Sequence, residues 1–351
     1  MSTTDWKIFT GQNKPHNGLL ALPAPPPWRF SRPPLPLQLP AAKEATSSEA
    51  EQHRALPFIT SEPMRLAVNA ALYLRRPLLL TGKPGTGKST LIAKVAHELK
   101  LGPVLRWPIN SRSTVRSGVY EYDAVGRLQA GKDADPPVQD YLTLGPLGTA
   151  LLAQTWPRAL LIDEIDKSDL DFANDLLNVI EDGEYEIPEL RRLGRESVEV
   201  RDFSGHTVRI DKGRLVCGQF PFVVMTSNAE REFPAPFLRR CVRLTIAPPS
   251  KGELAAIVDS HLKQHAANLA RIDAEDPVPK PRKAPDHDDI VALIDDFDTS
   301  RKENKEVSTD QLLNAVFLTV AMRDGEGRSF SEKELAQVRA NLTEPLSGQG
   351  G

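Results

Sequence analysis

The chain has 351 residues, which is enough for one large or two modest domains, each with a buried core. Its 44 Lys and Arg residues nearly balance its 47 Asp and Glu residues, and this balance argues against a dedicated duplex-DNA binder with a basic face. The longest apolar runs have the length of strands, and the N-terminus lacks the basic start and apolar core of a signal peptide. We therefore expect a cytoplasmic protein without a membrane partner. Cys217 and Cys241 lie far apart without metal-ligand spacing, so we expect two reduced thiols.

The N-terminal region is rich in proline. Residues 21–40 contain eight prolines, which cannot donate to a β-ladder, so we expect an extended or irregular chain. The charged stretch that follows is typical of a linker, and we assign residues 1–55 to a Pro-rich arm and linker. Two roles stay open for the arm. It is either a strap on its own domain, held by Trp28 and Phe30, or a ligand for a proline-binding groove of a partner.

From about residue 56, apolar segments of strand length alternate with helical patterns. A helix with Ser61 as its candidate N-cap comes first. The segments that follow are predicted as strands at 77–82, 103–109, 159–164, 220–228 and 241–249, and as helices from Lys88, around 142–155 and at 169–181. Such alternation predicts a parallel sheet that is covered by helices on both faces.

Beyond Pro249 only helical patterns occur. Ser250 and Glu253 form a capping box that opens a helix to about residue 268, and a charged, proline-broken loop near 271–288 is expected to be disordered. Further helices are predicted near 288–300, 309–323 and 332–342. We therefore assign residues 56–249 to an α/β domain and residues 250–345 to a small all-helical domain.

The segment "GKPGTGKST" fits the pattern G-x-x-x-x-G-K-[ST], between an apolar strand and a helix. Its glycines let backbone N–H groups point at phosphate oxygens, and the helix N-terminus adds a partial positive charge. Lys88 would neutralise the β- and γ-phosphates, and the Ser89 hydroxyl would ligate Mg²⁺. The sequence therefore predicts a nucleoside triphosphate site formed by Gly82, Lys83, Pro84, Gly85, Thr86, Gly87, Lys88, Ser89 and Thr90.

The apolar strand "ALLIDEID" ends in paired acids. Asp163 at the carboxyl edge of a sheet can hold the water shell of Mg²⁺, and Glu164 can polarise an attacking water as general base. This pair indicates a hydrolase rather than a kinase. Asp166 and Asp169 are interpreted as surface charges and helix caps.

Two further positions follow the later strands. Asn228 ends the segment "FVVMTSN" and is either a turn residue or an amide that lies between the γ-phosphate and the attacking water. Arg239 and Arg240 stand side by side in "PAPFLRRC". Their guanidiniums either meet acids of the chain's own lid or meet a negative charge on another molecule.

Four of these segments, "GKPGTGKST", "LLIDEID", "TSN" and "FLRRC", resemble the motifs of AAA+ ATPases in order and spacing. More narrowly, "NAALYLRRPLLLTGKPGTGKST", "YLTLGPLGTALL" and "SNAEREFPAPFLRRC" resemble the MoxR branch, over about residues 20–325. The resemblance implies a P-loop module with a five-stranded parallel sheet of order 5-1-4-3-2, a helical lid domain and a ring of six subunits. It implies ATP as the nucleotide, and it makes Arg240, with Arg239 second, the residue that reaches the γ-phosphate of the neighbouring subunit.

MoxR-type proteins act as chaperone-like motors, often on a partner that carries a von Willebrand factor A domain. The resemblance therefore implies a client protein. It also implies that two insertions, at 118–137 and 186–221, face the central pore. The second insertion carries a hairpin signal around Ser204 and Gly205. In the first, Tyr120 and Tyr122 either contact a peptide or pack in the core.

The match to the family is weaker in the lid. Many AAA+ proteins supply an arginine there, but residues 308–310 are Ser, Thr and Asp, and Arg323 lies several turns later, so we assign no lid residue to the site. His261 and His265 are expected to be exposed helix residues rather than metal ligands. Residues 55–60 are the candidate base contact. Two other functions stay open: a DNA- or RNA-stimulated motor or loader, although nucleic acid is not the expected partner, and a weakly hydrolysing nucleotide-dependent scaffold.

Overall fold

A computed structural model describes residues 6–29, 35–130, 136–153, 155–275, 287–303, 307–321 and 337. The chain forms two compact units. The first comprises residues 1–55, 60–82 and 88–246, and the second comprises residues 56–59, 83–87 and 247–351, in so far as they are described. Phe30, the loop at 276–286 and nearly all of the helix predicted at 332–342 lie outside the described residues.

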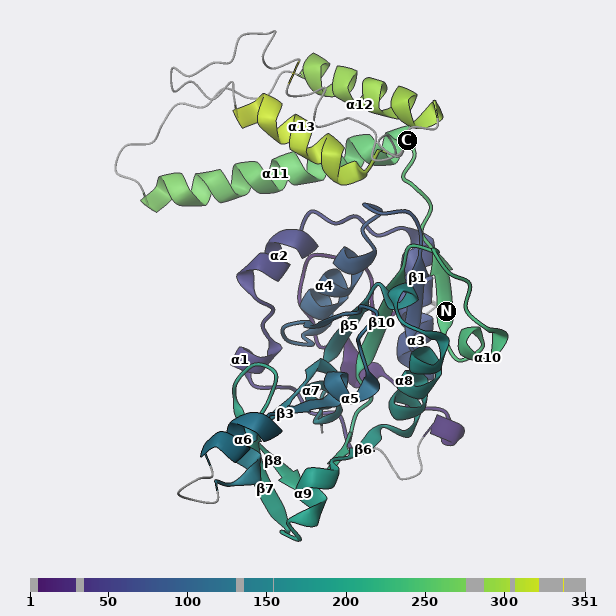
Figure 1. The fold of residues 1–351 in the computed structure, drawn as a ribbon. Coiled ribbons are helices and arrows are strands. Elements are labelled where there is room, and N and C mark those ends of the chain that lie inside the picture. The colour runs from purple at the N-terminus through teal and green to yellow at the C-terminus, as the bar shows by residue number, and fades with distance from the viewer. Residues whose placement is uncertain are drawn as a thin grey trace, which may run out of the picture. The chain divides into compact units, whose positions relative to one another are not determined.

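The first unit is built on a sheet of five parallel strands (Figure 1). The strands are β1 (Leu78–Thr81), β2 (Leu105–Pro108), β5 (Ala159–Asp163), β10 (Phe222–Ser227) and β11 (Val242–Thr245). Their spatial order, β11-β1-β10-β5-β2, is the predicted order 5-1-4-3-2. All side chains of β10 are buried, as expected for a central strand with both faces covered.

The helices of this unit begin where the sequence places caps. The Ser61 side chain accepts the Met64 N–H at the start of α3 (Glu62–Leu74), and the Asp169 side chain accepts the Phe172 N–H at the start of α8 (Leu170–Asp182). Asp169 is therefore confirmed as a cap. The remaining helices of the sheet region are α4 (Lys88–Leu99), α5 (Val115–Val119), α7 (Pro146–Leu151) and α10 (Ala235–Leu238).

The helix predicted around 142–155 is shorter than expected. Residues Leu142–Leu144 form β4, because Leu142 and Leu144 alternate with Thr143 and point their side chains into the core. Gly145 is the extended N-cap of α7, and Pro146 occupies its first turn, which fixes the start of the helix at this point.

Both predicted insertions join one second sheet of six strands, with the order β3-β4-β7-β8-β9-β6. Its strands are β3 (Tyr120–Tyr122), β4, β6 (Glu184–Glu186), β7 (Ser197–Arg201), β8 (Thr207–Asp211) and β9 (Arg214–Val216), with α6 (Ala124–Ala130) and α9 (Pro188–Arg192) in the connections. The predicted hairpin is confirmed as the antiparallel pair β7–β8, whose turn has Gly205 at φ +85°.

Tyr120 packs in the core instead of facing outward. It is 2% exposed, and its hydroxyl donates a 2.6 Å hydrogen bond to Glu189 Oε2. Burial and this carboxylate raise the pKa of Tyr120. Tyr122 is half-buried. The exposed apolar side chains of the insertions are Val125 and Leu128 on α6 and Phe203 beside the β7–β8 turn.

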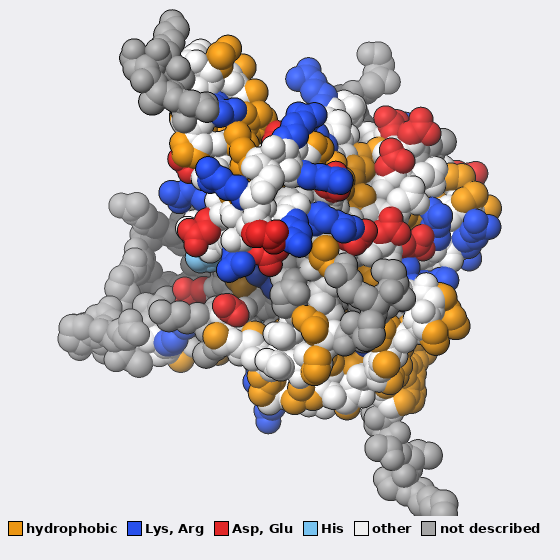
Figure 2. Space-filling model, turned by 90° about the horizontal axis from the view of Figure 1, so that it is seen from below, with side chains coloured by type: hydrophobic (Ala, Val, Ile, Leu, Met, Phe, Trp, Pro, Cys, Tyr) orange, Lys and Arg blue, Asp and Glu red, His pale blue; other side chains and the backbone are white. Residues whose placement is uncertain are grey.

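The surface charges of the second sheet are largely paired. Ion pairs join Arg209 to Asp211, Lys212 to Glu196, Arg214 to Glu184 and Arg191 to Glu186. Figure 2 shows Lys and Arg side chains interspersed with Asp and Glu on the face seen from below. The described residues of this face form no single basic field of the kind that binds a nucleic-acid backbone.

The N-terminal arm is part of the first unit. Ile8, Phe9 and Leu19 are buried, with Phe9 and Leu19 fully inaccessible, so the arm is a strap on its own domain. Of its two predicted anchors, Trp28 was wrong, because it is 76% exposed, and Phe30 lies outside the described residues. The segment assigned to a linker instead contains the helices α1 (Ala42–Ala45) and α2 (Glu49–Ala55), and Glu51 Oε1 of α2 accepts the Val104 N–H at 2.9 Å.

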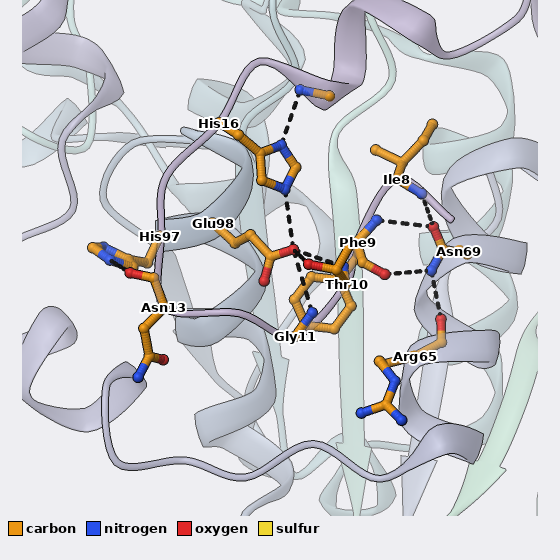
Figure 3. Close-up of polar contacts among 11 residues, drawn as sticks. Ile8, Phe9, Thr10, Gly11, Asn13, His16, Arg65, Asn69, His97 and Glu98 are labelled. Atoms are coloured by element: carbon orange, nitrogen blue, oxygen red, sulfur yellow. Dashed lines mark hydrogen bonds and ion pairs between the residues drawn. The ribbon is translucent and has the colours of Figure 1, made fainter. Parts of the chain in front are cut away.

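Two buried polar side chains hold the backbone of the arm (Figure 3). Asn69 on α3 accepts the N–H groups of Ile8 and Phe9 and donates to the Phe9 carbonyl. Glu98 on α4 is fully buried, and its Oε1 accepts from the Thr10 N–H and from His16 Nε2. Residues 8–16 therefore obtain from these side chains the hydrogen bonds that a strand would obtain from a neighbour.

The second unit contains a small helical bundle of α11 (Lys251–Glu275), α12 (His287–Lys302) and α13 (Thr309–Ala321). Its core includes Leu254, Val258, Ile294, Phe297, Leu312 and Val316. The predicted capping box is present: Glu253 Oε2 accepts the Ser250 N–H at 2.7 Å, and Ser250 Oγ accepts the Glu253 N–H at 3.3 Å.

Three expectations about special residues can be compared with the described part of the chain. Cys217 and Cys241 are both buried and free. In the described residues, no group of three or more His, Cys, Asp or Glu side chains could hold a metal ion. His261 and His265 are half-buried and not exposed as expected, and His265 packs edge-on against Phe317. No helix within the described ranges is long and apolar enough to cross a membrane.

Candidate nucleotide-binding site

The candidate site lies at the carboxyl edge of the five-stranded sheet. β1, β10 and β5 are neighbours in that sheet, so the segments that follow them begin side by side. Lys88 and Asn228 lie in the segments that follow β1 and β10, and Asp163 is the last residue of β5. The structure thus brings together three predicted site residues that are far apart in the sequence.

Lys88 is the first residue of α4 and is 8% exposed. Its Nζ donates to Asn228 Oδ1 at 2.8 Å and to the Gly82 carbonyl at 2.7 Å. Burial lowers the pKa of Lys88, while the nearby charges of Asp166, Asp163 and Glu164 act to raise it. A buried ammonium that is surrounded by oxygen acceptors is suited to binding phosphate oxygens.

Asp163 ends β5 and is held by two hydroxyl groups. Ser89 Oγ donates to Asp163 Oδ1 at 2.9 Å, and Thr226 Oγ1 donates to the same oxygen. Thr226 is 1% exposed and also accepts the backbone N–H of Glu164 at 2.9 Å. The Thr226 hydroxyl therefore fixes both acids of the predicted pair.

Glu164 lies at a sharp change of backbone direction. Its φ of 59° and ψ of 49° are left-handed, so its side chain leaves the chain in a different direction from that of Asp163. Glu164 Oε2 is 2.6 Å from Lys167 Nζ, at the end of the 3-10 turn η4 (Ile165–Lys167), and both side chains are half-exposed. The hydrogen bond to Glu164 raises the pKa of Lys167.

Asp166 was interpreted as a surface charge or cap, and this interpretation is wrong. The residue is 4% exposed, and its Oδ2 accepts the N–H of Asn228 at 3.0 Å and that of Glu230 at 3.2 Å. Its Oδ1 is buried and has no hydrogen-bond partner among the described residues. Asp166 thus fixes the backbone that presents the Asn228 amide to Lys88.

The loop at 82–87 has the conformation that its glycines permit. Gly85 and Gly87 adopt φ of +74° and +83°, where other residues are strained. A Cβ on Gly87 would lie 2.6 Å from Phe58 Cε2, so the ring of Phe58, within the candidate base contact, lies against the loop. Lys83 and Pro84 are exposed, and Thr86 Oγ1 donates to the Lys83 carbonyl at 2.9 Å; Thr90 is half-buried.

The two arginines differ in their surroundings. Arg240 Nε is 3.3 Å from Glu181 Oε2, and its Nη1 donates to Asn178 Oδ1 at 3.3 Å, so its acid partner belongs to α8. Arg239 is exposed, and its carbonyl accepts a hydrogen bond from Arg76 Nη1 at 2.8 Å. The structure thus places these arginines apart from the group formed by Lys88, Asp163 and Asn228.

Sequence reasoning missed three contributors to this region: Thr226, Asp166 and Glu181. Thr226 lies two residues before Asn228 in a strand whose other inward residues are apolar, and a buried hydroxyl so close to a site was the available signal. Asp166 follows an acidic pair on a turn and resembles a solvated charge. Glu181 carries no local signal at all.

Together, the sheet order and the loop define the α/β P-loop fold of AAA+ proteins, with a helical C-terminal region. Residues 77–241 match the family model described as an AAA domain of the dynein-related subfamily. This segment contains the loop, Asp163, Glu164, Asn228, Arg239 and Arg240.

One solved structure similar to this chain is that of NtrX from Brucella abortus in complex with ADP. The two chains are 15% identical with a TM-score of 0.41. The match covers 80% of the present chain and 55% of the NtrX chain, so this chain spans about half the length of that protein. A search of curated proteins gave no match.

Proposed function

We propose that this protein is a Mg²⁺-dependent ATPase of the MoxR branch that uses hydrolysis to remodel or activate a partner protein. The contact that supports this most directly is the chain of hydrogen bonds from Ser89 through Asp163 to Thr226 and the Glu164 N–H. It places Asp163, which accepts two hydroxyl hydrogen bonds, and the half-exposed Glu164 at the end of the same buried strand.

The residues around Asp163 fit a magnesium ion. Mg²⁺ prefers oxygen ligands and keeps several of its waters, and the Ser89 hydroxyl and the Asp163 carboxylate supply oxygens 2.9 Å apart. These two residues would hold the ion, which would neutralise charge on the phosphates. Lys88 would bind the β- and γ-phosphate oxygens in exchange for its present bonds to Asn228 and Gly82.

Glu164 would take a proton from the attacking water, since its carboxylate is half-exposed and, within the described part of the chain, contacts Lys167 Nζ at 2.6 Å. Asn228 would orient that water through the amide that now meets Lys88. The P-loop glycines would let backbone N–H groups reach the phosphates.

Arg240 would act on ATP bound by a neighbouring subunit of a homo-oligomeric ring, six subunits in the MoxR branch. Arg240 and Arg29 both contact Glu181, so these three described side chains together carry a net positive charge. A group of this kind is suited to meeting a triphosphate on another molecule. Arg239, being exposed, is the second candidate.

The client would be a protein, and a protein that carries a von Willebrand factor A domain is one candidate. It would contact the second sheet and its connections, where Val125, Leu128 and Phe203 expose apolar side chains. These three residues replace Tyr120 as candidates for contact, since Tyr120 is in the core. The mixed charge in Figure 2 does not favour nucleic acid.

The first experiment separates nucleotide binding from hydrolysis. Lys88→Ala should abolish calorimetric binding of ATP with Mg²⁺, whereas Lys263→Ala, a change of an exposed lysine on α11, should leave it intact. Glu164→Gln should bind ATP and lose about 10²- to 10⁴-fold in turnover, the range of a lost general base. Absence of nucleotide binding by the unmodified protein would overturn the proposal. Equal turnover by Glu164→Gln would favour the scaffold function.

The second experiment tests assembly. Turnover per chain should rise with protein concentration, and Arg240→Ala mixed with Lys88→Ala should regain hydrolysis that neither chain has alone. A monomer with concentration-independent turnover would rule out the ring. Strong, salt-sensitive stimulation of turnover by DNA or RNA would instead favour a nucleic-acid motor.

A further inference from the structure

The N-terminal arm and the predicted arginine finger meet at one carboxylate. Glu181, near the end of α8, has its Oε1 3.4 Å from Nη1 of Arg29, in the 3-10 turn η2 (Pro27–Arg29) of the arm. Its Oε2 is 3.3 Å from Nε of Arg240. One carboxylate is therefore shared by two guanidiniums, so the group of three side chains has a net positive charge.

Arg29 is held tightly at this point. Its side chain is 5% exposed, its guanidinium lies 5.4 Å from the centroid of the Phe220 ring, and its Nη2 donates to the Arg75 carbonyl. Burial lowers the pKa of Arg29, and the charge of Glu181 acts against this. A buried guanidinium depends strongly on its partner, so Arg29 and Glu181 fix each other.

Arg240 is less constrained than Arg29. Its side chain is 29% exposed, and its contacts with Glu181 and Asn178 use Nε and Nη1. These contacts set the orientation of the guanidinium plane and leave Nη2 for an incoming phosphate oxygen. The orientation of Arg240 is therefore determined by the carboxylate that Arg29 holds.

We infer that Arg29 of the arm and Glu181 of α8 are positioning residues for Arg240, and that the arm thereby contributes to hydrolysis in the neighbouring subunit. This inference rests on the proposed function, since it assumes that Arg240 acts on ATP bound next door. It adds that Arg29, which lies outside the matched AAA segment, affects through Glu181 how well that arginine works.

The direct test is Arg29→Met, which keeps the aliphatic stem and removes the charge. Because the chain's own nucleotide site is intact, the KM for ATP should stay within about twofold. The kcat should fall about 10- to 100-fold, the scale of loss when a catalytic group is misplaced by about 1 Å. The matched control is Lys7→Met, which breaks another ion pair of the arm, to Glu62 at 2.9 Å, and should keep the original kcat.

Mixing identifies the subunit that is affected. Arg29→Met chains have a working nucleotide site but a poorly held finger, whereas Lys88→Ala chains have a well-held finger and no working site. Mixed rings should regain turnover above that of Arg29→Met alone. The double variant Arg29→Met/Lys88→Ala, mixed with Arg29→Met chains, should give no such rescue, because its own Arg240 is also poorly held. If Arg29→Met instead damaged the nucleotide site of its own chain, neither Lys88→Ala nor the double variant would restore turnover.

A second variant guards against loss of folding. Glu181→Gln leaves Arg29 buried without its charge partner, so it is compared with Glu181→Gln/Arg29→Met, which removes both charges. If the two residues act through one path, the double variant should lose no more kcat than the larger single loss. Unchanged kcat in Arg29→Met, with Arg240→Ala inactive and complemented by Lys88→Ala, would overturn this inference alone. Full activity of Arg240→Ala would overturn the finger itself.

Discussion

Lys88 Nζ and Asn228 Oδ1 are joined by a 2.8 Å hydrogen bond between residues 140 positions apart. This bond connects the start of α4 with the end of β10. It shows that the Lys88 ammonium and the Asn228 amide, which follow two neighbouring strands of the sheet, occupy one small space. Preorganised polar groups of this kind need little rearrangement when charge develops in a reaction.

Thr226→Val should weaken magnesium binding at the proposed site. The substitution removes the hydroxyl that bonds Asp163 and accepts the Glu164 N–H, so the Mg²⁺ concentration for half-maximal turnover should rise about 10- to 100-fold. The free energy of unfolding should fall by about 1–3 kcal/mol, because a buried N–H loses its acceptor. Thr226→Ser keeps the hydroxyl and should change neither quantity much. An unaltered Mg²⁺ titration in the valine variant would contradict this role.

Asp166→Asn should move the alkaline limit of nucleotide binding to lower pH. Phosphate binding needs Lys88 protonated, so affinity falls as pH rises through the pKa of Lys88. Burial already lowers that pKa, and the Asp166 charge raises it, so removing this charge should lower it further. Dissociation constants for ATP measured between about pH 7 and 10 would show the shift. Asp171→Asn, at an exposed position on α8, is the control, and identical pH profiles for Asp166→Asn and the unmodified protein would exclude the coupling.

Asn69→Ala should detach the arm. The buried backbone N–H groups of Ile8 and Phe9 and the Phe9 carbonyl would all lose their side-chain partner. Each unsatisfied group costs about 1–3 kcal/mol, so we expect the free energy of unfolding to drop by about 3 kcal/mol in denaturant titrations. Asn314→Ala, at an exposed helical position on α13, should stay within about 0.5 kcal/mol of the unmodified protein. Equal stability of the two variants would count against the arm as a structural element.

Lys94 should make stability depend on pH in the alkaline range. It is 1% exposed, and burial lowers its pKa to about 8, against the opposing charge of Glu98. Between this value and the unfolded pKa of about 10.4, the unfolded chain binds more protons than the folded one, so the Lys94 contribution to stability increases with pH. Relative to Lys94→Met, the free energy of unfolding should rise by up to about 1.4 kcal/mol per pH unit from about pH 8 to 10. Parallel curves for the two proteins would show that Lys94 does not titrate there.

Much of the α/β unit could be predicted because its signals are local. Strand-length apolar runs, the loop at 82–90 and the acids at the end of β5 can each be recognised from a few neighbouring residues. The sheet order came from the family resemblance, and the structure confirms it.

The remaining features could not be predicted, because they depend on contacts between distant residues. Nothing near Asn69 or Glu98 indicates that they hold the backbone of residues 8–16, which is 60 to 88 positions away. Asp166 looks solvated in sequence because its neighbours are charged, yet the turn η4 points it at the Asn228 N–H. Trp28 looks like an anchor because of its size, but it is exposed, whereas the smaller Ile8 and Leu19 of the arm are buried.

Because the strap formed by residues 6–29 is part of the buried core, we expect the shortest stable form of this unit to include it. A shortened chain that begins at residue 56 would uncover the apolar surface now filled by Ile8, Phe9 and Leu19, and would leave Asn69 and Glu98 with unmet hydrogen-bonding capacity. We expect such a fragment to be aggregation-prone although every nucleotide motif is present in it. The segment that matches the AAA domain model is therefore smaller than the unit that we expect to fold.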